Sequence, residues 1–419
     1  MKEHNRPSAA GVGRAVLKAG SDALASRIAS NEAKSGGKAN LVCVMEGSRP
    51  FCVTSLISET KTMRGPSPED PLTNSQIAEL LARAGDDAKP PLSKAFRRAS
   101  RKALLWPEEA SLLYQEGRSL TELPGVGPYL EKTISRWIES SAVVPSTPDI
   151  RENFLTRTQA RAILEKQPTW SALAKGDLQM HTLWSDGSAS IQEMAEAGEA
   201  RGYEYIAVTD HSKGLKVAGG INEEQLEQQA AEISAVNDSL RLRGSMLRVL
   251  RSIEVNLSLA GDVDMEPSSL SRLDIVLGCF HSSLRKKDDQ TDRYLAALRN
   301  PAIQILGHPR GRVYNFRLGL NADWTRIFAV AADLDKAVEI DSYPDRQDMS
   351  IDLIKLARKA GCRISIGTDS HGPSQLEFIE FGLAAALKAR IDPDRILNFM
   401  SRNDLAEWAA GLRDRSGNP

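Results

Sequence analysis

Two stretches of the chain decide its fold class: ARGYEYIAVTDH at residues 200–211 and RKAGCRISIGTDSH at residues 358–371. In each, a helical pattern ends at a glycine, which suits the position just after a helix C-terminus. A run rich in β-branched residues follows and leads to Thr-Asp and a histidine, which indicates a strand that delivers polar side chains at its end.

The same rhythm of apolar strand, polar loop and amphipathic helix continues from Asp177 onward and is typical of parallel βα units. The expected strands end at His181, Val208, Val255, Phe280, Leu306, Ile340 and Ile366. Seven such units predict an α/β fold in which the sheet closes into a TIM-like barrel, rather than an open sheet.

Composition sets limits on what the chain does. Its 419 residues suit two or three domains, and 41% hydrophobic residues with a formal net charge of -1 give no overall bias toward nucleic acid or membranes. Because no apolar run approaches about 18 residues and the N-terminus has no signal-peptide core, we expect a cytoplasmic protein without a membrane partner. The cysteines form no CxxC pair and are expected to be reduced, buried thiols: Cys43, Cys52, Cys279 and Cys362.

The part that precedes the barrel changes character several times. Residues 1–38 are rich in Ser, Ala, Gly and Lys and predict a mobile tail, with a short helix over residues 14–28. Residues 39–72 contain two apolar runs around a Glu-Gly-Ser turn, which predicts a short β hairpin. We assign no function to it. Helical periodicity over residues 73–141 predicts a compact helical module, and residues 142–175 predict a linker to a domain over residues 176–412.

Polar side chains gather at the expected strand ends of the barrel. Five of the six histidines and three acidic residues lie there: His181, His211, His281, His308, His371, Asp186, Glu254 and Asp369. The carboxyl ends of barrel strands meet at one rim, so these side chains should converge. Imidazole and carboxylate groups without a thiolate suit zinc, manganese or iron. Eight ligands exceed the needs of one ion, which predicts two or three divalent ions that share Glu254 and activate a bound water, with no protein nucleophile.

Six segments in order resemble the motifs of the polymerase and histidinol phosphatase (PHP) domain, in particular the form at the C-terminus of bacterial family X DNA polymerases. They are GDLQMHTLWSDG (176–187), AVTDH (207–211), SIEVN (252–256), GCFHSS (278–283), LGHPRG (306–311) and GTDSH (367–371). The resemblance implies a distorted (β/α)7 barrel, phosphoesterase activity and the eight ligands named above. Where the wider family has His-x-His, this chain has Gln179 before His181, so Gln179 either binds a metal through its carbonyl or lies behind the ligands.

Basic residues follow the ligands in the loops and are candidates for binding the substrate phosphate. They are Lys213, Arg285, Arg310 and Arg346, with Lys286 beside them. Arg310, two residues after His308, is the leading candidate because a guanidinium binds phosphate through two parallel hydrogen bonds. The alternative is that these residues are solvated loop charges.

The segment LPGVG at residues 123–127 leads directly into a helical pattern and resembles a helix-hairpin-helix element. Such a glycine turn directs backbone N–H groups and a helix N-terminus at a DNA phosphate; the alternative is a simple loop between packed helices. A basic stripe precedes it if that segment is helical. The expected DNA contacts are Gly125, Val126, Gly127, Arg97, Arg98 and Arg101.

Residues 73–141 resemble the small helical domain that begins family X polymerases, although no lyase role is assigned to Lys132. That family has a polymerase palm between the two domains, and the roughly 35 residues available here cannot hold one. We therefore expect a DNA phosphoesterase, acting as a 3′–5′ exonuclease, 3′-phosphatase or abasic-site endonuclease, and no polymerisation. The alternatives are a small-molecule phosphatase of the histidinol-phosphate or nucleotide type and a non-catalytic DNA-binding protein.

Overall fold

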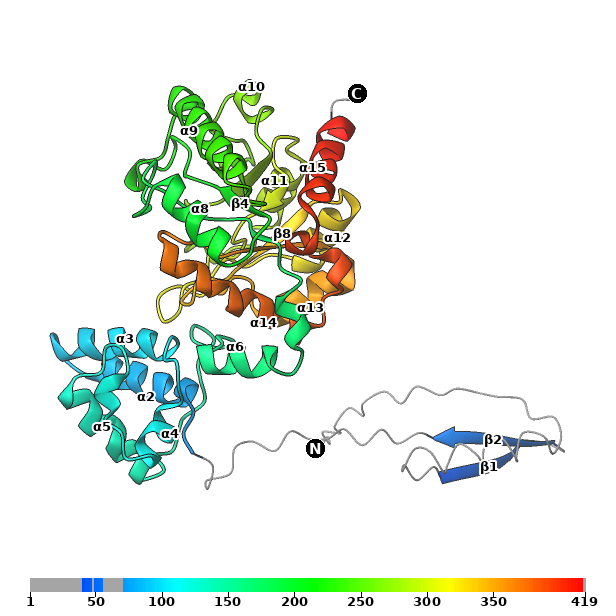
Figure 1. Cartoon of the computed structure of the whole chain (residues 1–419). Coiled ribbons are helices and arrows are strands. Elements are labelled where there is room, and N and C mark those ends of the chain that lie inside the picture. Colours follow the sequence, from blue (N-terminus) through cyan, green and yellow to red (C-terminus); the bar gives the residue numbers. More distant parts are fainter. Residues whose placement is uncertain (1–39, 47–48, 56–70, 417–419) are drawn as a thin grey trace. The chain divides into compact units, whose positions relative to one another are not determined.

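The computed structural model describes residues 40–46, 49–55 and 71–416, the first two ranges by their backbone alone. The chain divides into two units, residues 1–68 and 69–419. In the first, β1 (Asn40–Glu46) and β2 (Arg49–Ser55) form an antiparallel pair (Figure 1). The expected tail over residues 1–38, with its short helix, lies outside the described residues.

The second unit begins with a helical module. Its elements are α2 (Asn74–Asp87), α3 (Leu92–Ala103), α4 (Ala110–Gln115), η1 (Leu120–Glu122) and α5 (Pro128–Glu139). Thr73 caps α2 in a capping box with Gln76, which satisfies two backbone N–H groups at the helix start. The apolar faces of these helices enclose one core, in which Ile77, Trp106 and Ile134 are fully buried.

Residues 142–175 differ from the expected linker because they contain α6 (Arg157–Leu164) and α7 (Pro168–Ser171), which pack on α14 (Ile379–Ala389). The Arg157 guanidinium pairs with Glu377 at 2.7 Å and with Glu380 at 2.8 Å. The buried indole of Trp170 donates a hydrogen bond to the Leu383 carbonyl at 3.0 Å. These contacts attach the segment to the barrel over a separation of more than 200 residues.

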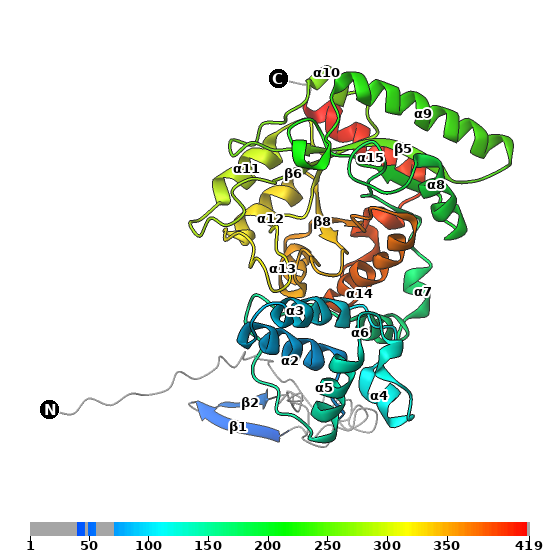
Figure 2. The ribbon, with the colours of Figure 1, turned by 90° about the vertical axis from the view of Figure 1, so that its left-hand side faces the viewer.

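The rest of the unit is a seven-stranded parallel barrel, which confirms the predicted fold class (Figure 2). Its strands are β3 (Gly176–Asp177), β4 (Tyr205–Val208), β5 (Arg248–Asn256), β6 (Ile275–Cys279), β7 (Ile305–Leu306), β8 (Ala337–Asp341) and β9 (Arg363–Gly367), hydrogen-bonded in chain order. A parallel bridge between Met180 and Ser370 joins the first and last strands, so the sheet closes.

Helices cover the outside of the barrel. They are α8 (Ile191–Ala200), α9 (Glu223–Leu242), α10 (Pro267–Leu270), α11 (Thr291–Arg299), α12 (Trp324–Asp333), α13 (Ile351–Ala360), α14 and α15 (Arg402–Ser416). Gly202 and Gly361, the two predicted helix ends, have φ values of 75° and 81°, a region that favours glycine. Cys279 and Cys362 are buried free thiols, as expected. Among the described helices, none combines the length and apolar character needed to cross a bilayer.

Candidate metal centre

The eight side chains expected as ligands come together at the carboxyl ends of the strands. They follow β3, β4, β6, β7 and β9, whereas Glu254 lies within β5 and is fully buried. Glu254 Oε1 is 2.9 Å from His281 Nε2 and 2.9 Å from His308 Nε2. Its Oε2 is 3.4 Å from His181 Nε2 and 3.5 Å from His211 Nδ1. One carboxylate therefore contacts four imidazoles.

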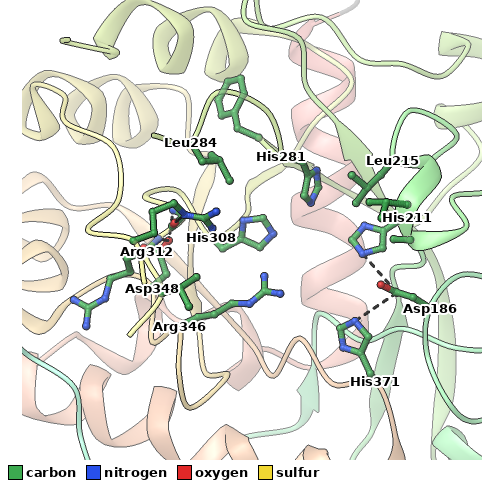
Figure 3. Close-up of a pocket in the computed structure, with 16 residues that line it drawn as sticks. Asp186, His211, Leu215, His281, Leu284, His308, Arg312, Arg346, Asp348 and His371 are labelled. Carbon is green, nitrogen blue, oxygen red and sulfur yellow. Dashed lines mark hydrogen bonds and ion pairs between the residues drawn. The ribbon is translucent and has the colours of Figure 1, made fainter. Parts of the chain in front are cut away.

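Asp186 and Asp369 hold the other side of the cluster. Asp186 Oδ1 is 3.4 Å from His371 Nε2, 3.6 Å from His211 Nε2 and 4.0 Å from His181 Nδ1, and the first two contacts are visible in Figure 3. Asp369 Oδ1 is 2.9 Å from His181 Nε2. The His371 Nδ1 atom faces the Asp369 backbone carbonyl at 2.8 Å. A metal-binding histidine usually has such a hydrogen-bond partner on its second ring nitrogen, which fixes the orientation of the ring.

The donor set fits divalent metal ions. Each of the eight side chains belongs to a group of histidine, cysteine or carboxylate donors whose ligand atoms lie within 4.8 Å of one another. Within the described chain, four buried atoms of the cluster and of Gln179 lack a hydrogen-bond partner: Gln179 Oε1, His181 Nδ1, His211 Nδ1 and Asp369 Oδ2, the last of which has only the ion pair with Arg346. Buried lone pairs without a partner are costly, and a cation would satisfy them.

Electrostatics support the same conclusion. Burial disfavours the imidazolium form of His308, yet Glu254 raises the pKa of His308 to about 10. Burial likewise opposes ionisation of Glu254, but the charges of His211 and His308 hold its pKa well below the usual range. The carboxylates of the cluster therefore favour a positive charge beside them, which a bound metal ion would supply.

Gln179, which stands where the wider family has a histidine, is fully buried beside Glu254. Its side-chain amide donates to Glu254 Oε2 at 3.1 Å and leaves the carbonyl oxygen without a partner. The carbonyl is therefore free to accept a cation.

β8 supplies two buried carboxylates that the sequence analysis did not identify, because no histidine marks the end of that strand. Glu339 Oε2 accepts the His308 backbone N–H at 2.7 Å, and burial raises the pKa of Glu339 to about 8. Burial also raises the pKa of Asp341 well above its usual range. Cys279 lies in a donor group with Glu254 and His308, but burial raises the pKa of its thiol, which opposes thiolate ligation.

The two Thr-Asp-His stretches use their aspartates differently. Asp369 is one of the cluster carboxylates, whereas Asp210 supports the loop that carries Asp186. Asp210 accepts hydrogen bonds from the Thr182 backbone and hydroxyl at 2.8 and 2.7 Å and from Ser185 at 2.5 Å. Identical short motifs therefore have different roles at different strands.

A cavity of about 310 Å³ is lined by Asp186 and by four of the histidines, His211, His281, His308 and His371 (Figure 3). Three guanidinium groups line it as well: Arg312, Arg317 and Arg346. Arg346 Nη1 is 2.9 Å from Asp369 Oδ2, which brings its positive charge next to the cluster (Figure 3). The cavity therefore combines metal-type donors with cations that suit an anionic ligand.

The other expected substrate residues lie elsewhere. Arg310 does not line the cavity, and its backbone N–H, with that of Gly311, donates to Asp348 at 3.2 and 2.5 Å. Lys213 pairs with Glu223 at 2.7 Å. Arg285 stacks over a neighbouring aromatic ring in a separate groove. Arg312 and Arg317, which sequence reasoning missed, lie further along the loop that begins at His308.

The helical module contacts this same loop, residues 311–317. The Tyr314 hydroxyl is 3.0 Å from the Ser100 hydroxyl of α3, and the Tyr314 ring packs edge-on against Phe154. The Arg312 guanidinium lies 3.7 Å over the Phe154 ring. Arg151 donates to the Asn315 side chain at 2.8 Å. The module, through Ser100, and the segment that follows it, through Arg151 and Phe154, thereby contact a wall of the cavity.

The expected DNA contacts lie on the surface of the module with one exception. Gly125, at φ 84°, and Gly127, which precedes α5, are exposed, whereas the Val126 side chain is buried in the module core. Arg98 and Arg101 are exposed on α3, and Arg97 is exposed but paired with Asp86 at 3.3 Å. A Cβ on Gly125 would lie 3.2 Å from the Lys102 side chain, so the glycine turn adjoins the basic face of α3.

Comparisons with known proteins find related sequences, although no family model matches. The chain is 36% identical over 232 residues to the DNA polymerase/3'-5' exonuclease PolX of Bacillus subtilis strain 168, which covers 55% of this chain and 40% of that protein. It is 26% identical over 236 residues to a probable phosphatase of Thermoanaerobacter sp. strain X514, covering 53% of this chain and 89% of the relative. The match thus spans two fifths of the Bacillus relative and nearly all of the probable phosphatase.

Among solved structures, a histidinol phosphate phosphatase from Lactococcus lactis, complexed with zinc, L-histidinol and phosphate, covers 59% of this chain and 95% of its own. It is 16% identical, with a TM-score of 0.35. A likeness this low carries no argument about substrate. The conclusions therefore rest on the geometry of the cluster and on the sequence relatives.

Proposed function

The barrel of this chain is a PHP domain, and from that premise we propose that the protein is a metal-dependent phosphoesterase that hydrolyses phosphate esters in DNA. The cluster of histidines and carboxylates supports metal-dependent hydrolysis, and both sequence relatives carry names of phosphoester-cleaving proteins. The choice of DNA over small phosphate esters as the substrate is the more specific part of the proposal.

The residues that would hold two or three divalent ions, manganese, zinc or iron, are the eight side chains of the cluster, with the free carbonyl of Gln179 as an additional donor. They are His181, Asp186, His211, Glu254, His281, His308, Asp369 and His371. Ions bound there would lower the pKa of water to about 7 and neutralise charge on the phosphoryl group.

The chain's own residues then bind and orient the ester. Arg346, beside Asp369, faces the cavity and is placed to bind a phosphate oxygen. Arg312 and Arg317 line the cavity too, and their attachment to fixed carbonyls and rings keeps them in position. No serine, threonine or cysteine lines the described cavity, so the chain offers no hydroxyl or thiol nucleophile there.

One observation favours DNA as the substrate: the module with the exposed glycine turn and the basic face of α3 packs on Tyr314, in the loop that lines the cavity. A phosphate backbone bound by Gly125, Gly127, Arg98 and Arg101 would therefore be held by the same body that forms the cavity wall. The Bacillus relative, named as a polymerase and exonuclease, agrees with this assignment.

A second candidate is a small-molecule phosphatase, because the probable phosphatase of Thermoanaerobacter is matched over 89% of its length. In that case the helical module would only support the cavity wall. Salt dependence separates the two functions, since binding through DNA phosphates weakens steeply with salt whereas turnover of a small ester does not.

The test is hydrolysis of a single-stranded oligonucleotide with added manganese, measured as KM against salt for the wild type and an Arg98→Ala/Arg101→Ala variant. We expect the double variant to raise KM at low salt and to reduce the salt slope by about one for each phosphate that the protein no longer neutralises. A deletion of residues 1–150 is unsuitable because it would remove Glu79 and leave Arg151 unpaired.

The matched control is Arg241→Ala on α9, an exposed arginine paired with Asp238, which should leave both KM and slope unchanged. His281→Ala should abolish hydrolysis of every substrate. If the wild type hydrolyses small phosphomonoesters and leaves DNA intact, the small-molecule phosphatase replaces the DNA phosphoesterase.

A further inference from the structure

A second groove adjoins the metal-centre cavity and has a different lining. It measures about 530 Å³ and is formed by basic and apolar side chains, chiefly Arg285, Lys286, Lys287, Phe316 and Arg317. We refer to these five residues as the basic groove. Arg317 and Leu284 line both hollows, so the groove continues from the cavity in which the phosphate would be cleaved.

The charges of the groove are not neutralised by the protein. Within the described part of the chain, Arg285, Lys286 and Lys287 form no ion pair. Asp288 and Asp289, which follow them directly, instead accept hydrogen bonds from Gln290 and Thr291 at 2.9 and 2.8 Å. Lys213, in the loop that follows His211, is by contrast paired with Glu223 at 2.7 Å. Three adjacent unpaired cations produce a positive potential that attracts a polyanion.

The groove also exposes an aromatic ring. The Phe316 side chain keeps 55% of its surface exposed, and the Arg285 guanidinium lies 4.6 Å over the ring. A flat aromatic and guanidinium surface beside lysines is the combination on which nucleic-acid bases stack while their phosphates are bound. Phe316 belongs to the loop that contacts the helical module. Tyr314, two residues earlier in the same loop, is buried against that module.

We propose that the basic groove binds the single-stranded segment that adjoins the phosphate in the metal centre, with a base on Phe316 and backbone phosphates on Arg285, Lys286 and Lys287. This proposal rests on the proposed action on DNA and adds the path of the strand. Stacking on Phe316 requires an unpaired base, so the groove selects single-stranded ends over duplex.

The experiment compares the full-length wild type with Phe316→Ala and with Lys286→Ala/Lys287→Ala. Steady-state constants are measured with manganese for oligothymidylates of increasing length and for bis(p-nitrophenyl) phosphate, a diester that carries no nucleotide strand. We expect Phe316→Ala to raise KM for long oligothymidylates about tenfold and to abolish the fall of KM with length. Hydrolysis of bis(p-nitrophenyl) phosphate should remain at the wild-type rate.

Two exposed residues outside the groove provide matched controls: Leu242→Ala removes an apolar side chain from α9 and Lys166→Ala removes a surface charge. Neither should change the length dependence. An unchanged KM in both groove variants would overturn the proposed strand path while leaving the DNA phosphoesterase intact. A wild type that hydrolyses bis(p-nitrophenyl) phosphate but no oligonucleotide would overturn the proposed function and this inference with it.

Discussion

The metal centre and the contact between the helical module and the barrel both bury charged side chains, but they satisfy them differently. At the contact, Arg151 donates to both oxygens of Glu79 at 2.8 and 2.9 Å, and its remaining nitrogen reaches Asp86 and Asn315. Arg151 and Glu79 thus each have an opposite charge and direct hydrogen bonds to it.

The metal centre gathers three carboxylates and five histidines, and several of their buried atoms lack partners. Among the described residues, Asp369 pairs with Arg346, whereas Glu254 and Asp186 face imidazoles and no lysine or arginine. Burial alone therefore does not separate a structural charge cluster from a ligand-binding one. The separating property is whether the protein itself completes the hydrogen bonds.

The largest expected effect comes from Glu254→Gln, which removes the carboxylate that four imidazoles share. We expect the rate of hydrolysis to fall by more than about 100-fold. Loss of a residue that only hydrogen-bonds to a metal ligand costs up to about 100-fold, and Glu254 is itself an expected ligand. Bound manganese, measured by elemental analysis, should fall in parallel.

A Glu254→Gln variant with full metal content and wild-type hydrolysis would show that this carboxylate is structural, and the contrast between the two regions would disappear.

The next prediction concerns a substitution that should lower the free energy of unfolding and leave the metal centre unchanged. Arg151→Met leaves Glu79 as a buried carboxylate without its main partner, which should lower the free energy of unfolding by about 3–5 kcal/mol. Chemical denaturation measures the decrease, and metal content per folded molecule should stay normal.

Arg83→Met is the matched control, because Arg83 also contacts Glu79, at 2.8 Å, but its side chain is 38% exposed. It should cost at most about 1 kcal/mol. Equal decreases from the two substitutions would mean that the buried pair contributes no more than a surface pair.

The smallest effect tests a buried charge that has no carboxylate partner in the described chain. Lys336 donates to the Asn300 carbonyl at 2.5 Å, and burial lowers the pKa of Lys336 from 10.5 to about 8. Between these two values the unfolded chain binds more protons than the folded one, so wild-type stability should rise as the pH increases from about 8 toward 10.5.

Lys336→Met should abolish that rise and stabilise the protein at neutral pH by about 1 kcal/mol, after allowing for the missing hydrogen bond. Urea unfolding on both sides of pH 8 measures the difference. A variant less stable than the wild type at neutral pH would contradict the assignment of Lys336 as an unfavourable buried charge.

Much of the barrel could be read from the sequence because its signals are local. The expected strand end at Val208 is where β4 ends, and the expected end at Ile366 lies one residue before the end of β9. The histidines and carboxylates could be grouped because the ends of parallel strands meet at one rim whatever the loops do. Strand order therefore explains why the strand-end donors share one rim, whereas the position of Asp186 also depends on the loop that Asp210 supports.

The basic residues were predicted less well because their positions depend on loop paths. Arg310 was favoured for its nearness to His308 in the sequence, yet the chain turns there so that backbone N–H groups face Asp348, 37 or 38 residues further on. Arg312 reaches the cavity edge because its guanidinium rests on Phe154, far earlier in the chain. Neither contact can be predicted from the residues that surround Arg310 and Arg312 in the sequence.

The sequence by itself determined the parallel barrel and the donors at its rim, since both follow from short patterns repeated along the chain. Only the tertiary structure decided which arginines line the cavity, that residues 142–175 pack on α14, and that Phe316 stands in a basic groove beside the cavity. The physical reason is that strands and helix ends are set by neighbouring residues, whereas loop positions are set by packing partners distant in the chain.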